Sequence, residues 1–373
     1  MQNRYKVTTW NIEWLGRLLR DIDDDRKSDN QRARLQQRLL AIYEAIAEIA
    51  PDVLCITEGP AGDTAIDRFV DGMPGYTAVK RPPGEPYHQR GQQWIWFLVK
   101  DSLAASASLL PITVWRDYTE QASPDAEHQA NWPVHRWGSI DTTAHNHFRH
   151  PQVLTVTLGD TKVEMIGGHF KSKLTTVGNY HSEDAETRRK YIEATLENRI
   201  KLATEAQNVR YYLDHRFRQE VNPAIMLMGD FNDGPGKELF ERQFLFFDLL
   251  DNLQGDVFAA EKYLNHALFD YPAELRWSVR FNDRIEPNRD PHILLDHILF
   301  TQAFVKNRLP LCVEAHAGKV EHECFDRITA QLPSGLRLSD HKPVTCLITQ
   351  AANSRCLDET SVVSTANDRR CRP

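Results

Sequence analysis

The sequence predicts an α/β fold in one large domain, and three observations support this prediction. Short apolar runs bounded by breaker residues recur along the chain, as at residues 52–57 and 224–229, and their length is typical of buried strands. Residues 31–50 instead carry apolar side chains at three- and four-residue steps, which predicts an amphipathic helix. The chain has 373 residues, enough for a large core, and shows no internal repeat or clear linker before residue 350. We therefore expect one domain over residues 1–350 and a polar, disordered tail over residues 351–373.

Composition narrows the class of protein further. The apolar fraction is 41% and the charged fraction 26%, as in ordinary globular proteins, and no apolar run is long enough to span a membrane. The first residues lead into a strand rather than a signal peptide, so we expect a cytoplasmic protein that does not enter membranes. The six cysteines form no CxxC pair, which favours reduced thiols over a zinc site. The net charge of −7 argues against a protein coated with DNA-binding charge, but a locally basic groove or a bound cation would still attract nucleic acid. No protein partner is indicated.

The first third of the chain alternates predicted strands with other segments. Residues 7–14 predict an opening strand with Asn11 near its end, and residues 20–29 a charged loop. The helix over 31–50 should end at Pro51. The strand over 52–57 then leads to Glu58, a Pro- and Gly-rich connection covers 72–91, and an aromatic strand covers 93–99.

The rest of the chain repeats this alternation. We expect a loop at 119–131, and strands at 139–142, 153–157, 163–167, 224–229 and 293–300. The segment 338–344 opens a last strand. Between these strands, residues 182–218 predict a long helix with a basic side, which is more often a solvated surface than a ligand groove; its cations are Arg188, Arg189, Lys190, Arg199, Lys201 and Arg210.

Polar side chains follow several of the predicted strands. Asp230 and Asn232 come directly after the apolar run that ends at Gly229. Residues two apart in an extended chain point to the same side, so a carboxylate and a carboxamide should lie together there. The alternative is an Asx-rich turn that merely closes the strand. The functional interpretation is favoured because other strand ends carry matching groups, namely Asn11, Glu58, His169, Asp296, Asp340 and His341.

This ordered set, in its local contexts, resembles the endonuclease/exonuclease/phosphatase superfamily with its deoxyribonuclease-I-like fold. The matching segments are Trp10-Asn11-Ile12-Glu13, Leu54-Cys55-Ile56-Thr57-Glu58, Gly168-His169-Phe170-Lys171-Ser172, Gly229-Asp230-Phe231-Asn232, Leu295-Asp296-His297-Ile298 and Ser339-Asp340-His341-Lys342-Pro343. They extend over nearly the whole chain. The resemblance implies a four-layer sandwich of two packed mixed β-sheets flanked by helices, with a metal-dependent site that cleaves phosphoesters where strand ends converge.

The chemistry implied by the resemblance assigns roles to these residues. Phosphodiesters are anionic and hydrolyse slowly, so their cleavage needs a cation, an activated water and donors for developing charge. Mg²⁺ or Mn²⁺ takes oxygen ligands, and Glu58 fits as a ligand with Asn11 beside it and Asp340 reaching the same region. The alternative for Glu58 is a cap of the turn at Gly59.

The remaining roles concern the water and the phosphate. The resemblance pairs His341 with Asp296, which would orient the imidazole and raise its basicity. Asp230 is the candidate to orient or deprotonate the water, and Asn232 to hold a phosphate oxygen. Whether Asp230 or the Asp296–His341 pair is the general base stays open at this point.

His169 and Lys171 are two residues apart and are expected on one face, where both could meet phosphate oxygens or the leaving group. The sequence departs from some deoxyribonuclease-like proteins here. Their corresponding histidine pairs with a glutamate on the aromatic strand, whereas residues 91–94 contain no acid. Arg149 could also reach a phosphate. Its neighbours His145, His147 and His150 lack an acidic partner in sequence and are interpreted as a polar loop rather than a metal site.

Three functions compete on this evidence. The first is a Mg²⁺- or Mn²⁺-dependent nuclease that acts on DNA or RNA. The second is a phosphatase or phosphodiesterase acting on phosphoinositides, sphingomyelin or small nucleotides, and the absence of a lipidation motif disfavours lipids. The third is a catalytically inactive binding module, which would need a broken site although every expected acid and histidine is present. Nothing in the sequence distinguishes DNA from RNA or endonuclease from exonuclease.

Overall fold

The computed structural model describes residues 3–111, 132–135, 140–244, 248–305 and 308–350. The expected loop at 119–131 and the expected tail at 351–373 lie outside these residues. So does Ser139 at the start of the strand expected over 139–142, and the strand found nearby is β7 (Thr142–His145), which pairs with β6 (Trp132–His135).

Two six-stranded sheets form the centre of the molecule. The first sheet has the strand order β15 (Leu311–Val320), β16 (Val344–Gln350), β1 (Arg4–Asn11), β2 (Val53–Gly59), β4 (Trp94–Lys100) and β3 (Tyr76–Ala78). The second sheet has the order β11 (Asn265–His266), β14 (Asp296–Phe300), β10 (Ile225–Asp230), β9 (Thr161–His169), β8 (Gln152–Leu158) and β5 (Ser108–Leu109). Both sheets are mixed, because β1 pairs with β2 and β9 with β10 in parallel while their other pairings are antiparallel.

The apolar runs of the central strands are continuous because both faces of each sheet are covered. In β2, Val53 and Cys55 point into the core between the sheets, whereas Leu54 and Ile56 point to the outer side. In β10 the same alternation points Met226 and Met228 into the core between the sheets, and Ile225 and Leu227 toward the helices. Three apolar cores therefore separate four layers, as the resemblance predicts.

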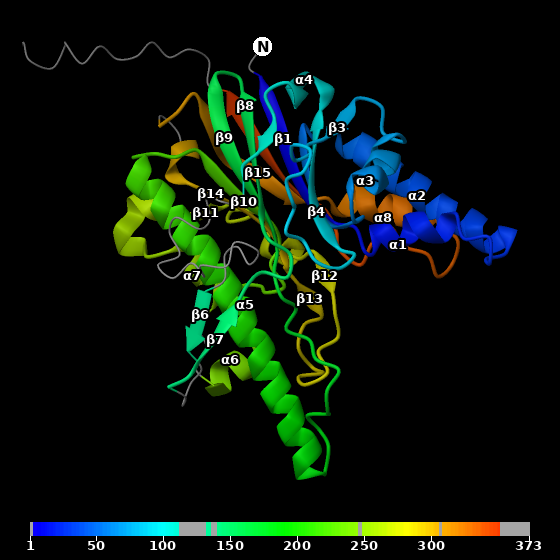
Figure 1. Cartoon of the computed structure of the whole chain (residues 1–373), viewed down its shortest axis with the longest axis vertical. Coiled ribbons are helices and arrows are strands. Elements are labelled where there is room, and N and C mark those ends of the chain that lie inside the picture. Colours follow the sequence, from blue (N-terminus) through cyan, green and yellow to red (C-terminus); the bar gives the residue numbers. More distant parts are fainter. Residues whose placement is uncertain (1–2, 112–131, 136–139, 245–247, 306–307, 351–373) are drawn as a thin grey trace, which may run out of the picture.

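Helices form the two outer layers (Figure 1). The first sheet is covered by α1 (Leu15–Ile22), α2 (Asp29–Ile49), α3 (Asp63–Val70) and α8 (His322–Gln331), and the second by α5 (Ala185–Gln219) and α7 (Leu249–Gln254). Shorter elements are α4 (Asp101–Ala104), α6 (Leu239–Phe244), the hairpin of β12 (Val279–Arg280) and β13 (His292–Ile293), and the 3₁₀ turns η2 (Val257–Lys262), η3 (Ala273–Leu275) and η4 (Gln302–Phe304).

The two long helices expected over 31–50 and 182–218 begin and end close to their expected residues because both have strong end signals. Ser28 and Gln31 form a capping box at the start of α2, and Ala50 takes a left-handed conformation before Pro51 at its end. The Asp184 side chain accepts from two backbone N–H groups at the start of α5.

The loop expected over 20–29 is partly wrong, because α1 extends through Ile22. The opening strand also stops at Asn11 rather than continuing to Trp14, whose left-handed backbone (φ 51°) turns the chain into α1. A short amphipathic helix followed by a charged turn has too few periodic positions to be separated from a loop by pattern. None of the helices among the described residues has the length and apolarity needed to cross a membrane.

Candidate active site

The second sheet places three predicted site residues side by side. In the register of its central strands, Asp230 at the end of β10 lies opposite His169 at the end of β9 and Asp296 at the start of β14. All three side chains are buried. Gly229 and Gly168 pair one position earlier, where a Cβ on Gly229 would lie only 1.9 Å from the Gly168 carbonyl oxygen. The sequence therefore needs glycine here for the strands to approach and present their polar ends together.

The first sheet contributes Asn11 from the end of β1, Glu58 from β2 and His341 from the segment before β16. Hydrogen bonds fix this side of the site. The Ser339 hydroxyl donates to the Asn11 carbonyl at 2.7 Å, and the Trp10 indole donates to the His341 carbonyl at 2.9 Å. The Ser-Asp-His segment is thus anchored on the strand that carries Asn11.

The groups from the two sheets meet at Oδ2 of Asp230. The Asn11 amide nitrogen donates to this oxygen at 2.8 Å, and Nε2 of His169 and of His341 lie 3.6 and 3.9 Å from it. Nδ1 of His341 lies 2.7 Å from Oδ2 of Asp296. The pairing of His341 with Asp296 expected from the resemblance is therefore present in the structure.

Burial and neighbouring charges shift the protonation of these groups. Burial raises the pKa of Asp230 to about 6, although the nearby His341 opposes the shift. Burial alone would lower the pKa of His341, but Asp296 and Asp230 outweigh it and raise it to about 10. Burial, assisted by the positive charge of Arg149, holds the pKa of His169 well below its ordinary value. The site thus pairs a cationic imidazole with a neutral one around a single carboxyl group.

Glu58 extends the site toward solvent. The Asn11 amide nitrogen lies 3.5 Å from its Oε1, and the Trp14 backbone N–H donates to its Oε2 at 2.8 Å. Trp14, Glu58 and Asn232 all adopt left-handed backbone conformations, at φ 51°, 60° and 52°. Such conformations are strained for residues other than glycine and concentrate at functional sites.

Two expected side-chain directions differ in the structure. The sequence predicts Asn232 beside Asp230 in extended chain, but its left-handed backbone instead aims its N–H at Oδ1 of Asp230 (2.9 Å) and its amide nitrogen at the Phe170 carbonyl (3.0 Å). Lys171 lies beyond the end of β9, so strand alternation with His169 does not hold. Its ammonium group donates to the Ser172 carbonyl at 3.1 Å.

Arg149 and Asp340 also make contacts that the sequence did not reveal. The partly buried guanidinium of Arg149 donates to the backbone carbonyls of His169 and Phe170, at 3.3 Å each, and to the Gln93 side chain at 2.9 Å. Arg149 therefore fixes the backbone at the end of β9. Asp340 is partly exposed, and its carboxylate lies 3.8 Å from the Arg337 guanidinium.

Glu205 of α5 is a site neighbour that sequence reasoning missed. It is buried, accepts the Lys171 backbone N–H at 2.8 Å and lies 3.6 Å from His145. The available signal was a carboxylate in the inward-facing stripe of α5 that also contains Leu202 and Val209. A charged residue among apolar helix positions indicates a buried polar contact.

The basic side expected on α5 is neutralised by acids. Arg189 pairs with Glu186 and Glu193, Lys201 with Glu197, and Arg199 with Glu238 and Glu241.

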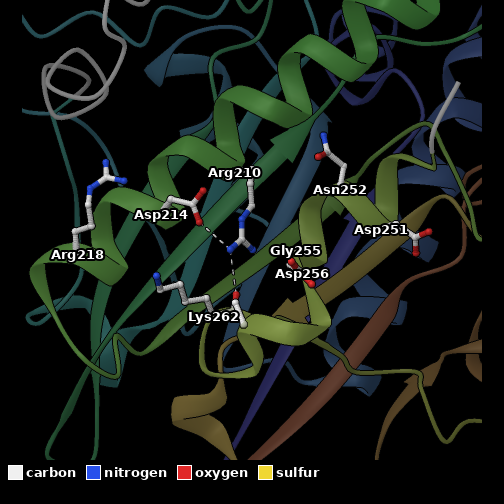
Figure 2. Close-up of a pocket in the computed structure, with 9 residues that line it drawn as sticks. Arg210, Asp214, Arg218, Asp251, Asn252, Gly255, Asp256 and Lys262 are labelled. Atoms are coloured by element: carbon white, nitrogen blue, oxygen red, sulfur yellow. Dashed lines mark hydrogen bonds and ion pairs between the residues drawn. The ribbon is translucent and has the colours of Figure 1, made fainter.

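A pocket of about 500 Å³ lies beside the C-terminal half of α5 (Figure 2). It is lined by Arg210, Asp214, Arg218, Asp251, Asn252, Gly255, Asp256, Ala259 and Lys262. Its most buried cation, Arg210, is already bonded to Asp214 and to the Lys262 carbonyl. No residue of the strand-end site lines this pocket.

The donor set of the strand-end site suits a hard cation. Within the described parts of the chain, one group of acids and histidines brings its ligand atoms within 4.8 Å of one another, and it consists of Asp230, Asp296 and His341. Oδ1 of Asn11 and Oδ1 of Asp296 are buried oxygens without a hydrogen-bond partner. Unpaired buried oxygens next to carboxylates fit a divalent ion with oxygen ligands. Glu58 and Asp340 lie outside the tight group.

A sequence model of the Endonuclease/Exonuclease/phosphatase family matches residues 8–341, which include every strand-end residue described above. The chain belongs to this family. Its members are phosphoester hydrolases that generally use divalent metal ions. No curated protein sequence matches the chain.

Solved structures of the endonuclease/exonuclease/phosphatase family resemble the chain over most of its length. Truncated Caenorhabditis elegans TDP2 is 15% identical, covers 93% of this chain and 98% of its own, and has a TM-score of 0.47. A family protein from Bacteroides thetaiotaomicron is 12% identical, covers 94% of this chain and 96% of its own, and has a TM-score of 0.49. The human Nocturnin catalytic domain with bound sulfate is 14% identical, covers 94% of this chain and 98% of its own, and has a TM-score of 0.45. At these identities the likeness concerns the fold alone, and no residue role is taken from it.

Proposed function

We propose that this chain hydrolyses phosphodiester bonds of nucleic acid with the help of a divalent ion, Mg²⁺ or Mn²⁺. The observation that carries this proposal is the convergence of Asn11, His169 and His341 on one carboxylate oxygen of Asp230. A buried carboxylate surrounded by donors suits the activation of a water next to an anionic phosphate.

Asn11, Glu58 and Asp340 are our candidates to hold the ion. A bound divalent ion would neutralise the phosphate charge and favour ionisation of a water. The Asn11 amide nitrogen contacts both Glu58 (3.5 Å) and Asp230 (2.8 Å), and its buried Oδ1 has no hydrogen-bond partner, which supports this assignment. Asp340 would join them from the solvent side, where its carboxylate is partly exposed.

The other residues would act on the water and the phosphate. Asp230 would orient the water and accept its proton, and His341, held by Asp296, would donate to a phosphoryl oxygen as charge develops. Asn232 keeps the Asp230 carboxylate in place through its backbone N–H, and its side chain is our candidate for a phosphate contact. His169 would meet the phosphate through Nε2.

Lys171 and Arg149 would support the phosphate from beneath the site. The Lys171 ammonium group is half-buried and near Glu205, so a direct contact requires it to leave the Ser172 carbonyl. The Arg149 guanidinium is bonded to the carbonyls of His169 and Phe170, so its contribution would be the field of a partly buried positive charge.

Exposed aromatic side chains at the rim support a nucleic acid as substrate. Trp14 is 46% exposed and bonded through its backbone to Glu58, and Phe148, which precedes Arg149, is 50% exposed. Aromatic rings beside a phosphate site offer stacking surfaces for bases. The Phe148 ring lies 6.0 Å from the Arg149 guanidinium carbon, and neither ring is buried in a core.

A smaller phosphoester, such as a small nucleotide, a phosphoinositide or sphingomyelin, is the second candidate. It is favoured by the pairing of the α5 cations with acids, which leaves that face without the positive field that a long duplex requires. A cytoplasmic location remains a prediction under either function.

A cleavage assay separates these candidates. Purified protein is incubated with single- and double-stranded DNA and RNA, small nucleotides and phospholipid headgroup substrates, each with Mg²⁺, with Mn²⁺ and with chelator, and the product ends are mapped. We expect metal-dependent cleavage of nucleic acid, lost in Asp230→Ala and His341→Ala variants that retain the circular dichroism of the parent. Intact nucleic acids in a metal-replete reaction would refute the nuclease proposal, and unchanged activity in both variants would refute the assigned site.

A further inference from the structure

A buried ion pair joins the two segments that follow the catalytic strands. Lys173 comes four residues after His169, and Asp233 comes three residues after Asp230. Nζ of Lys173 lies 2.6 Å from Oδ1 of Asp233, and the two side chains are only 10% and 7% exposed. None of the roles proposed above uses either residue.

The pair belongs to a larger cluster of three cations and four carboxylates. Lys173 contacts three of the carboxylates, and the fourth, Asp283, lies 3.6 Å from Arg289. Nζ of Lys173 also lies 2.8 Å from Glu238 and 3.6 Å from Glu241. Arg199 of α5 pairs with both glutamates, at 2.7 and 3.1 Å, and Arg289 pairs with Glu238 at 3.1 Å. Burial alone would lower the pKa of Lys173, but the three carboxylates outweigh it and raise it. The ammonium group is therefore charged and is held on several sides.

Asp233 also contacts the strand that carries Asp296, the hydrogen-bond partner of His341. The backbone carbonyl of Asp233 lies 2.8 Å from Nε2 of His297, which follows Asp296 directly in β14. The His297 ring stacks on Phe231 at a centroid distance of 5.0 Å. The segment from Asp230 to Asp233 is thus fixed between the Lys173 ammonium group and the strand that carries Asp296.

We propose that Lys173 is a positioning residue that sets the spacing between His169 and the Asp230–Asn232 segment through its ion pair with Asp233. This inference rests on the proposed function. Strand pairing alone fixes β9 and β10 only up to His169 and Asp230, where the ladder ends. Beyond that point Asn232 has a left-handed backbone. The Lys173–Asp233 pair then holds the segment after His169 to the segment after Asp230. Removing Lys173 leaves the buried carboxylate of Asp233 without its cation, so the segments must move to expose or rebind that charge.

An ion pair between α5 and β9 provides a matched control. Arg216 of α5 pairs with Glu164 of β9 at 2.7 Å, with side chains 19% and 13% exposed. Glu164 lies toward the start of β9, five residues before His169. Arg216→Met therefore removes a comparable partly buried ion pair far from the catalytic strand ends.

The experiment compares Lys173→Met, Lys173→Arg, Asp233→Asn and the double variant Lys173→Met/Asp233→Asn with Arg216→Met. kcat and KM are measured on the best substrate of the panel and corrected for the folded fraction. We expect kcat to fall by about 10- to 100-fold in Lys173→Met and in Asp233→Asn, the scale of an ångström-sized misplacement, while KM stays within about threefold. Lys173→Arg should recover part of the loss. The double variant should be no less active than the less active single variant, because both changes break the same Lys173–Asp233 pair.

Hydrogen exchange gives a readout that does not depend on turnover. Lys173→Met should speed exchange in residues 167–173 and 229–236, whereas Arg216→Met should leave these segments unchanged and keep the parent kcat. The inference is overturned if Lys173→Met keeps the parent kcat and exchange pattern, or if the two single losses add in the double variant. A parent protein that cleaves no phosphoester would refute the proposed function alone, because the exchange comparison still tests the coupling of the two segments.

Discussion

Replacing Gly229 with alanine tests whether the close approach of β9 and β10 builds the site. An alanine Cβ would lie 1.9 Å from the Gly168 carbonyl oxygen, so the two backbones must separate by about 1 Å to reach a tolerable contact. Gly229 also has a φ of 141°, which is unfavourable for a residue with a side chain. Strain of about 1–2 kcal/mol and overpacking of about 1–3 kcal/mol give an expected loss of about 2–5 kcal/mol in the free energy of unfolding.

The control for this prediction is Gly75→Ala. Gly75 has a φ of 91° and no atom within 4 Å of an added Cβ, so its substitution brings backbone strain without a clash. Urea denaturation followed by tryptophan fluorescence measures both variants. Because Gly229 directly precedes Asp230, the folded Gly229→Ala protein should also lose at least about 100-fold in kcat. If Gly229→Ala loses no more stability than Gly75→Ala and keeps its kcat, the argument that this contact sets the site is wrong.

Four further predictions concern single side chains. Asp296→Asn should lower kcat on the order of 10³- to 10⁴-fold at little change in fold, as measured by steady-state kinetics, because an amide no longer orients and charges the imidazole of His341. Glu58→Gln should raise the Mg²⁺ concentration for half-maximal activity by about tenfold or more in a metal titration, since one carboxylate ligand is lost. Trp14→Ala should raise KM for an oligonucleotide by about fivefold or more and leave KM for a phosphoester without a planar group unchanged, because base stacking is lost. Burial alone would raise the pKa of Glu238, but its cationic neighbours lower it to about 2. The ionised Glu238 therefore stabilises the fold fully above pH 4.5, its ordinary pKa, and this stabilisation is lost as the pH falls toward 2. The urea midpoints of the parent and of Glu238→Gln should therefore converge as the pH is lowered from 4.5 to about 2.

Much of the architecture could be predicted because the layers impose a pattern on the sequence. A strand covered on both faces is apolar throughout, so residues 52–57 and 224–229 are recognisable without any tertiary information. The polar residue that ends such a run must lie at the edge of the sheet. That is why the sequence predicts Asp230 and Glu58 close to one another, and the Asn11 amide nitrogen lies within 3.5 Å of both carboxylates.

The details beyond the strand ends could not be predicted, and the reason is backbone conformation. Strand periodicity predicts side-chain direction only while the chain remains extended. Asn232 and Trp14 have left-handed backbone conformations, for which no simple spacing rule applies. Lys171 lies two residues beyond the last residue of β9, so the strand no longer determines its side-chain direction. Their contacts depend on partners from distant segments, such as the Phe170 carbonyl that accepts from the Asn232 side chain.

The distribution of charge shows where an anionic substrate would be attracted. The chain carries a net charge of −7, and most of the cations of α5 that gave it an apparently basic side are paired with glutamates or with Asp214. Long-range attraction by the protein surface is therefore weak, and binding must depend on short-range groups. At the strand ends these are the imidazole of His341, whose pKa is raised, the partly buried guanidinium of Arg149 and the oxygens suited to a divalent ion. Under the proposed function, such a site would select a phosphate by its immediate surroundings, so we expect the rim side chains beside it, rather than the outer helices, to decide which phosphoester enters.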